Sequence, residues 1–529
     1  MIETTDNKIV DIPAEKFVFV NKGEKISDKK FDDKPIGYFK DAWNRFRKNK
    51  GSILAAYIIL AIILFALLAP VFVRSHNATF MDVNYAKKGP RNLWLMNHFN
   101  IAGGTVERDL NEKALIRLLA IGIGAEDTEG SGKISLTEGI NNYYQPVRWY
   151  GEGVEMTEIK GSKDKTIYPG RIDAYLEVGF MYKSIEQSEY AKIVAWQEES
   201  GCQVLYPLVE DNEWNLDSTD ANYWYKTKKG NPCRINAQGM AKTVAFTEDI
   251  VLEDNYKRDS EGNPIYYEYT GGGNIDTAQF KVRVLYYNYY RYLNGFEPQY
   301  LMGTDSQGYD MMLRLAGGIR LSFIVAICVS IINLTLGAIY GAIEGYYGGA
   351  VDIILERISD ILNGVPFIIV ATLFQIHMAK KVGAIPSLLF AYVLTGWIGM
   401  ASQVRTQFYR FKNQEYVTAA RTLGARDRRI IWKHIFPNSL GTIITGCILV
   451  IPGVINTESM LSFLGIVKLG DAKTTSLGTL LSDASAIWTN YPHLMIFPAI
   501  IISLLMICFN LFGNGLRDAF NPSLRGVEE

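Results

Sequence analysis

The chain has 529 residues, a formal net charge of −1 and a mean hydropathy of +0.03, averages that are typical of a large soluble protein. The order of the residues excludes that class. Residues 52–73 form a run of 22 residues without a charge, although 21% of the whole chain is charged. Because about 20 apolar residues cross the core of a bilayer as a helix, the sequence predicts a membrane protein.

Six such uncharged runs predict an all-α polytopic membrane protein with six transmembrane helices. A tail, 1–50, precedes the first helix within 51–73, and the remaining helices belong to a core at 301–529. Two runs are short and contain an interior proline, Pro366 or Pro452, so each is alternatively a re-entrant or interfacial segment. The runs are 52–73, 321–343, 361–378, 382–401, 440–455 and 494–512.

Basic residues predict the orientation of the chain, since they favour the cytoplasmic side of short loops. Arg45, Arg47, Lys48 and Lys50 directly precede the first run, and the loop 401–439 carries eight basic against two acidic residues. Six spans place these two regions on the same side. We therefore predict that both termini are cytoplasmic, and that the first run is a retained membrane helix, because it follows a charged tail of about fifty residues.

The segment 74–300 lies between the first two spans and contains no run long enough to cross a membrane. Frequent Gly, Asn and Pro break it into short elements, and 281–287 alternates like a strand, so we predict an inserted α+β extracytoplasmic domain. The tyrosine-rich segment 286–292 is assigned to the membrane–water boundary, ahead of a protein interface. Cys202 and Cys233 are the two cysteines outside the spans, and they form either a disulfide or two thiols.

Residues 127–138, DTEGSGKISLTE, match the twelve-residue EF-hand loop and predict a calcium site. Gly132 falls at the obligatory turn. The alternative is a surface turn in which the glycines only reverse the chain. Side-chain oxygens are predicted from Asp127, Glu129, Ser131 and Glu138, a backbone carbonyl from Lys133, and a water-mediated contact from Ser135.

A charged, helix-prone segment, 415–438, lies between the fourth and fifth spans and predicts a surface for a soluble partner. Ala419 and Ala420 permit close approach of a short helix, and Gly424 permits the turn that ends it. Pro437 is predicted to prevent continuation into the next helix. Glu415 supplies the acidic residue at the start of the segment.

The spacing Ala-Ala, three residues, Gly, twelve residues, Pro resembles the coupling loop of permease subunits in type I ATP-binding-cassette importers, in the form found in the C-type permeases of dipeptide and oligopeptide importers. Thr418 stands where the general motif has its opening Glu. Further motifs of this family occur in order at 303–308, 314–322, 458–465 and 516–522. The chain departs from the family at Tyr309, Asn514 and Asn521, and in its 227-residue insert.

The resemblance implies a transport subunit of the cell membrane, not an enzyme. No Gly-Lys-Ser/Thr occurs in the chain, so a phosphate-binding loop of the Walker A type is absent from the sequence. ATP would be hydrolysed on two ATPase subunits that hold the loop 401–439. A second permease would complete the path as a heterodimer, and an extracytoplasmic binding protein would deliver the peptide, with the insert facing outward in a single-membrane bacterium.

Three alternatives stay open from sequence. The same machine could import nickel, since nickel permeases share the motifs. A membrane-anchored sensor with an external calcium- or ligand-binding domain is less well supported, because a sensor needs no Ala-Ala-x3-Gly motif between spans. A channel that opens without ATP is weaker still.

Overall fold

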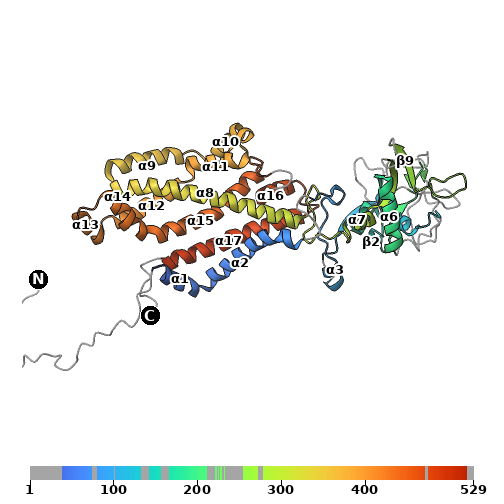
Figure 1. The fold of residues 1–529 in the computed structure, drawn as a ribbon, viewed down its shortest axis with the longest axis horizontal. Helices are drawn as coiled ribbons and strands as arrows, with labels where there is room; N and C mark the ends of the chain where they lie inside the picture. Colours follow the sequence, from blue (N-terminus) through green and yellow to red (C-terminus); the bar gives the residue numbers. More distant parts are fainter. Residues whose placement is uncertain are drawn as a thin grey trace, which may run out of the picture.

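The uncharged runs of the sequence form a bundle of long helices, and an α+β region lies at one end of that bundle (Figure 1). The structure is a computed structural model. It describes residues 38–73, 80–99, 102–132, 142–155, 166–210, 221, 222, 224, 227, 228, 231, 232, 254–271, 278–470 and 475–520.

The bundle begins with α1 (Tyr38–Lys48) and α2 (Lys50–Phe72) and resumes after the α+β region with α8 (Met311–Tyr347). The chain then forms α9 (Gly349–Asn363), α10 (Phe367–Val382), α11 (Ala384–Thr395), α12 (Ile398–Phe411), α13 (Glu415–Thr422), α14 (Asp427–Ile430), the π-helix η5 (Ile431–Ile435), α15 (Phe436–Phe463), α16 (Leu477–Ser485) and α17 (His493–Phe520).

Five helical segments of the described chain are long and apolar enough to cross a membrane: Lys50–Val71, Met311–Tyr347, Ala384–Phe411, Asp427–Phe463 and His493–Phe520. The sixth predicted span is the pair α9 and α10, which bends by 69° at the break between them. Gly364 and Pro366 lie in that break, and the proline has no N–H to continue the helix. The predicted fold class is therefore confirmed, with six spans when this bent pair counts as one.

Helix α8 lies at the centre of the bundle and packs against α2, α12 and α15. Gly337, Gly341 and Gly345 form a ladder on the face of α8 that contacts α12. A Cβ atom at Gly341 would lie 2.1 Å from the carbonyl oxygen of Ala401, so only glycine permits this approach. The ladder thus permits close packing of two helices within one chain.

The α+β region confirms the mixed class that we predicted for the insert. Two four-stranded antiparallel sheets follow the strand orders β1-β4-β2 and β5-β10-β6, with β3 and β9 paired to β4 and β10, and β7 pairs with β8 in a separate two-stranded sheet. Its elements are η2 (Val83–Tyr85), α3 (Leu93–Phe99), β1 (Thr105–Asn111), α4 (Glu112–Glu126), β2 (Val147–Tyr150), β3 (Val154–Glu155), β4 (Thr166–Asp173), η3 (Leu176–Val178), β5 (Phe180–Glu186), α6 (Gln187–Ser200), β6 (Leu205–Tyr206), β7 (Thr227–Lys228), β8 (Asn231–Pro232), β9 (Tyr267–Gly271), β10 (Gln279–Leu285) and α7 (Tyr286–Asn294).

Tyrosines fill the neck that joins the α+β region to the bundle. Tyr85, Tyr175, Tyr286, Tyr290 and Tyr300 form one buried cluster. The hydroxyl group of Tyr286 donates to both carboxylate oxygens of Asp82, at 2.8 and 2.7 Å. Burial raises the pKa of Tyr286, so this hydroxyl keeps its proton. The prediction that 286–292 lies at the membrane boundary is wrong for the buried tyrosines of α7, since they pack inside the protein.

A buried ion pair closes the neck on the side of α8. Arg314 lies 3.0 Å from Asp305, and its guanidinium group stacks over the ring of Tyr309 at 4.8 Å. Asp305 also accepts the backbone N–H groups of Gln307 and Tyr309. Tyr309, which departs from the family pattern, thus contributes a ring to the packing of this arginine.

Cys202 of this region is half-buried. Cys233 lies outside the described residues, so the pairing of these two cysteines stays a prediction.

Gly341→Ala should lower the unfolding temperature of the purified protein, because overpacking of this kind costs about 1–3 kcal/mol. Gly453→Ala is the matched control, since no atom outside its own helix lies within 4 Å of a Cβ there. Thermal unfolding in detergent compares the two variants. An unfolding temperature of Gly341→Ala equal to that of Gly453→Ala would contradict the close contact of α8 with α12.

Candidate functional site

Helix α13 lies at the end of the bundle that is far from the α+β region (Figure 1). It has eight residues, Glu415–Thr422, and most of its side chains are exposed. Val417 is the exception: it is fully buried against Phe408, Ile430 and Ile435. One apolar side chain therefore holds a polar helix onto the bundle and leaves the other faces of α13 uncovered in this chain.

The turn after α13 has the geometry that the sequence predicts for Gly424. This glycine has a φ of +79°, in the left-handed region that glycine adopts without steric cost. Its N–H donates to the carbonyl of Arg421 at 3.0 Å, and the N–H of Ala425 donates to the carbonyl of Ala420 at 3.1 Å. These two bonds form a Schellman motif, which ends α13 and directs the chain back to the bundle.

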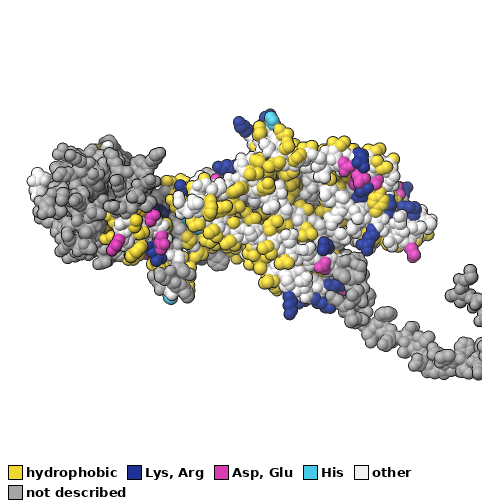
Figure 2. Space-filling model, turned by 180° about the vertical axis from the view of Figure 1, so that it is seen from behind, with side chains coloured by type: hydrophobic (Ala, Val, Ile, Leu, Met, Phe, Trp, Pro, Cys, Tyr) yellow, Lys and Arg dark blue, Asp and Glu magenta, His cyan; other side chains and the backbone are white. Residues whose placement is uncertain are grey.

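The exposed surface around this turn is more apolar than the sequence indicates. Leu423 is 87% exposed and Trp432 is 54% exposed, while Ala419 is exposed and Ala420 half-buried. Figure 2 shows hydrophobic side chains along the bundle and many Lys and Arg side chains at this end of it. Sequence reasoning missed Leu423 and Trp432. An apolar residue at the end of a short polar helix is the signal that would have pointed to Leu423.

Polar contacts tie the α13 region to the end of α8. Tyr346 donates to the carboxylate of Asp427 at 2.6 Å, and the guanidinium group of Arg421 lies 5.9 Å from the ring of Tyr346. The ammonium group of Lys412 donates to the carbonyl of Gly345 at 2.9 Å. Burial lowers the pKa of Lys412. The segment on both sides of α13 is thus held to the glycine-rich face of α8.

A second polar network joins α12 to α9 near the same end. Arg405 makes a two-point contact with Asp352, at 2.6 and 2.9 Å, and contacts Glu356 at 3.0 and 3.1 Å. Tyr409 donates to Asp352 at 2.5 Å. In the sequence, the charge of Arg405 indicates only orientation, because nothing in a single sequence pairs a basic residue with acidic residues about fifty positions away.

The prediction for Pro437 is wrong. Residues 427–463 form one helical segment, and Pro437 lies in the first turn of α15, directly after the π-helix η5. Proline is tolerated in the first turn of a helix, where its missing N–H group is not needed. The π turn before Pro437 also has i→i+5 hydrogen bonds in place of the usual i→i+4 bonds of an α-helix. Pro437 therefore marks a change of helix geometry and does not separate the loop from the fifth span.

Glu458 and Ser462, two residues of the later family motifs, meet inside the bundle. The carboxylate of Glu458 is buried and accepts hydrogen bonds from Ser322 at 3.1 Å and Ser462 at 3.0 Å. These contacts join α15 to α8, so the motif residues hold two spans together through polar groups.

The described part of the predicted calcium loop is a closed turn. The buried carboxylate of Asp127 accepts the backbone N–H groups of Ser131 and Gly132, both at 2.8 Å, and Glu129 is exposed. Lys133, Ser135 and Glu138 lie outside the described residues. Within the residues that the structure describes, no group of three or more His, Cys, Asp or Glu residues is placed to hold a metal ion.

Two family models match separate parts of the chain. Residues 37–90 match the N-terminal transmembrane domain of oligopeptide transport permease C, and residues 333–526 match the binding-protein-dependent transport system inner membrane component. A chain of the MetNI methionine ABC transporter is similar over 40% of this chain and 98% of its own length, with 16% identity and a TM-score of 0.33, a likeness too weak to carry any argument.

Similar full-length relatives come from several bacteria. The oligopeptide transport system permease protein OppC of Bacillus subtilis is 40% identical over 236 residues, which is 44% of this chain and 76% of the relative. The dipeptide permease protein DppC of the same organism is 41% identical, over 42% of this chain and 68% of its own length. OppC of Escherichia coli is 36% identical, over 43% of this chain and 74% of its own length. The chain belongs to the family of oligopeptide and dipeptide permease subunits of binding-protein-dependent ABC importers, and it carries an additional α+β region between its first two spans.

Proposed function

We propose that the chain forms half of the translocation path of an ATP-driven importer of oligopeptides or dipeptides. A second permease subunit completes the path, two ATPase subunits supply the energy, and an extracytoplasmic binding protein delivers the peptide. The exposed, rigidly held α13 is the single observation that carries this proposal. Relatives named for oligopeptide and dipeptide transport support the substrate class.

The surface formed by Glu415, Ala419, Ala420, Leu423 and Gly424 is proposed to fit a groove of one ATPase subunit. Small alanines permit close approach, and the exposed Leu423 supplies apolar area at the tip. Val417 and the contacts of Lys412 and Asp427 fix α13 to α8 and α12. A displacement of α13 would therefore move these helices as a unit and change access to the path.

The orientation of the chain is part of this proposal. The start of α2, the loop with α13 and the end of α17 lie at the end of the bundle opposite the α+β region (Figure 1). Eight basic residues of 401–439 and four beside the first span favour the cytoplasm for that end. Both termini would then be cytoplasmic, and the α+β region would face outward from the cell membrane.

Ala420→Asp should abolish attachment of the ATPase subunits, because it places a charge and added bulk in a close apolar contact. We expect at least a tenfold loss of co-purified ATPase, with membrane insertion unchanged. Ala379→Asp in α10 is the matched control, since Ala379 is also half-buried but lies outside this surface. Wild-type levels of co-purified ATPase with Ala420→Asp would refute the assignment of the surface.

Gly424→Val should reduce ATP-driven peptide uptake. The left-handed backbone conformation at this position is less favourable for a residue with a Cβ atom by about 1–2 kcal/mol, and less favourable still for a β-branched residue. No neighbouring atom lies within 4 Å of a Cβ there, so the effect tests the backbone and not a collision. Gly424→Asn, which tolerates this conformation better, should retain more uptake in proteoliposomes. Wild-type uptake by the Val variant would show that the turn is not needed.

Calcium binding at Asp127, Glu129, Ser131, Lys133, Ser135 and Glu138 is a separate proposal, which rests on the match of the sequence to the spacing of a calcium loop. Calcium should raise the unfolding temperature of the full-length protein, since a ligand of the folded state at about 100 times its Kd adds about 2.7 kcal/mol. Glu138→Gln should remove most of that rise. An unchanged melting curve at millimolar calcium would leave only a glycine-rich turn.

A further inference from the structure

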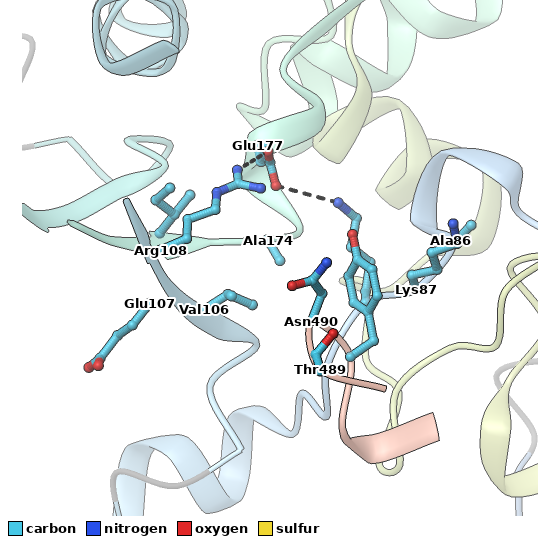
Figure 3. A pocket seen from close by; sticks show the side chains of 12 residues that line it. Ala86, Lys87, Val106, Glu107, Arg108, Ala174, Glu177, Thr489 and Asn490 are labelled. Atoms are coloured by element: carbon cyan, nitrogen blue, oxygen red, sulfur yellow. Dashed lines mark hydrogen bonds and ion pairs between the residues drawn. The ribbon is translucent and has the colours of Figure 1, made fainter. Parts of the chain in front are cut away.

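A cavity of about 360 Å³ lies at the seam between the α+β region and the bundle (Figure 3). Segments far apart in the sequence build it: the chain that follows α2, strand β1, the turn that follows β4, and the chain that precedes α17. Val106 and Ala174 contribute apolar surface, while Thr489 and Asn490 add polar groups from the bundle side.

The side chains around this cavity carry an excess of positive charge. Lys88 lies 3.7 Å from Glu177, and Arg108 donates to the same carboxylate. Figure 3 shows Arg108 and Glu177 facing each other on one side of the cavity, Lys87 on the opposite side, and Glu107 pointing away. The single negative charge of Glu177 therefore offsets only one of the three positive charges of Lys87, Lys88 and Arg108. Lys88 is only 14% exposed, and burial lowers its pKa, so an added anion would relieve the cost of that buried charge.

Lys87 is held in a backbone conformation that non-glycine residues rarely adopt. Its φ is +60°, and its N–H donates to the carbonyl of Asp305 at 2.9 Å. Its ammonium group lies 5.8 Å from the centre of the ring of Tyr491. Strained residues of this kind persist only where the surrounding structure fixes them, and they concentrate at functional sites.

The cavity lies beside the start of α17, the last predicted span. Tyr491 precedes α17 by two residues, and Ile496, Ile500 and Ile507 form an exposed apolar stripe along that helix. Trp488, in the same approach to α17, is 51% exposed. Exposed tryptophans beside apolar stripes mark the headgroup layer of a bilayer.

We propose that this cavity binds the phosphate of an anionic phospholipid headgroup, in the leaflet on the side of the α+β region. Two lysines, one arginine and the polar groups of Thr489 and Asn490 provide donors for phosphate oxygens, and the apolar stripe on α17 provides a path for the acyl chains. A bound lipid would then contact both parts of the protein and join the α+β region to the membrane.

Native mass spectrometry of the full-length protein, with phosphatidylglycerol or phosphatidylcholine added after delipidation, tests the site. We expect preferential retention of phosphatidylglycerol. Lys87→Gln and Arg108→Gln should each weaken that retention about fivefold, the effect of one basic residue near a headgroup. Lys192→Gln in α6 is the matched control, because Lys192 is exposed and distant from the cavity. Wild-type retention in the two cavity variants would overturn the proposal.

Glu177→Gln separates loss of charge from loss of folding. Removal of this carboxylate leaves a more positive cavity, so retention of phosphatidylglycerol should rise, whereas a misfolded seam would lower it in every variant. A fall with Glu177→Gln equal to that of the lysine variant would overturn the proposal. Displacement of the lipid by inorganic phosphate at 10-fold excess would assign the cavity to soluble phosphate. Displacement by an acidic peptide would assign the cavity to peptide carboxylates. Either result would overturn the proposal of a lipid site.

Discussion

Close contact between α8 and α12 is the constraint on which the arrangement of the bundle depends. Gly337, Gly341 and Gly345 contribute no side chain to this interface, so the backbone of α12 at Ala401 and Arg405 approaches α8 closely along about two turns. Contacts between helices inside a membrane gain most of their stability from such packing. The lipid tails are as apolar as the side chains, so the hydrophobic effect does not drive the helices together. Since α13 follows α12 directly, the ladder also sets where α13 lies. Lys412 continues this contact by donating to the carbonyl of Gly345.

A large insert is compatible with this bundle because its two ends meet. Helices α2 and α8 pack side by side, so the chain leaves and re-enters the bundle at neighbouring points. Backbone bridges pair Met81 with Tyr309 and Arg91 with Tyr300 across these two connections. An insertion between ends that are already close adds little loop-closure entropy. The buried neck then limits the freedom of the region, since Arg91 contacts Asp173 at 3.3 Å and lies against the ring of Tyr175.

Sequence pattern predicted the parts of the fold that depend on local composition. Uncharged runs of about 20 residues identify spans because the bilayer excludes charge, and Gly424 identifies a turn because a positive φ excludes most other residues. The parts that depend on contacts between distant segments were not predictable. The burial of Tyr286 in the neck needs the position of Asp82, and the π-helix that admits Pro437 needs the packing of Ile435 beside Val417. The exposure of Leu423 could not be predicted, because it depends on how the neighbouring helices pack at that end of the bundle.

Helix α8 connects the neck of the α+β region with the end of the bundle that carries α13. Helix α8 has 37 residues without a proline, which corresponds to a length of about 55 Å. It begins at the neck, where Arg314 contacts Asp305, and ends where Tyr346 contacts Asp427 beside α13. Helices α15 and α17 each contain an interior proline and can bend there. A displacement at α13 is therefore carried to the neck by α8 with little loss, whereas α15 and α17 can absorb part of it. Because the neck is packed on α8, we expect the α+β region to follow that helix when the proposed coupling at α13 displaces it.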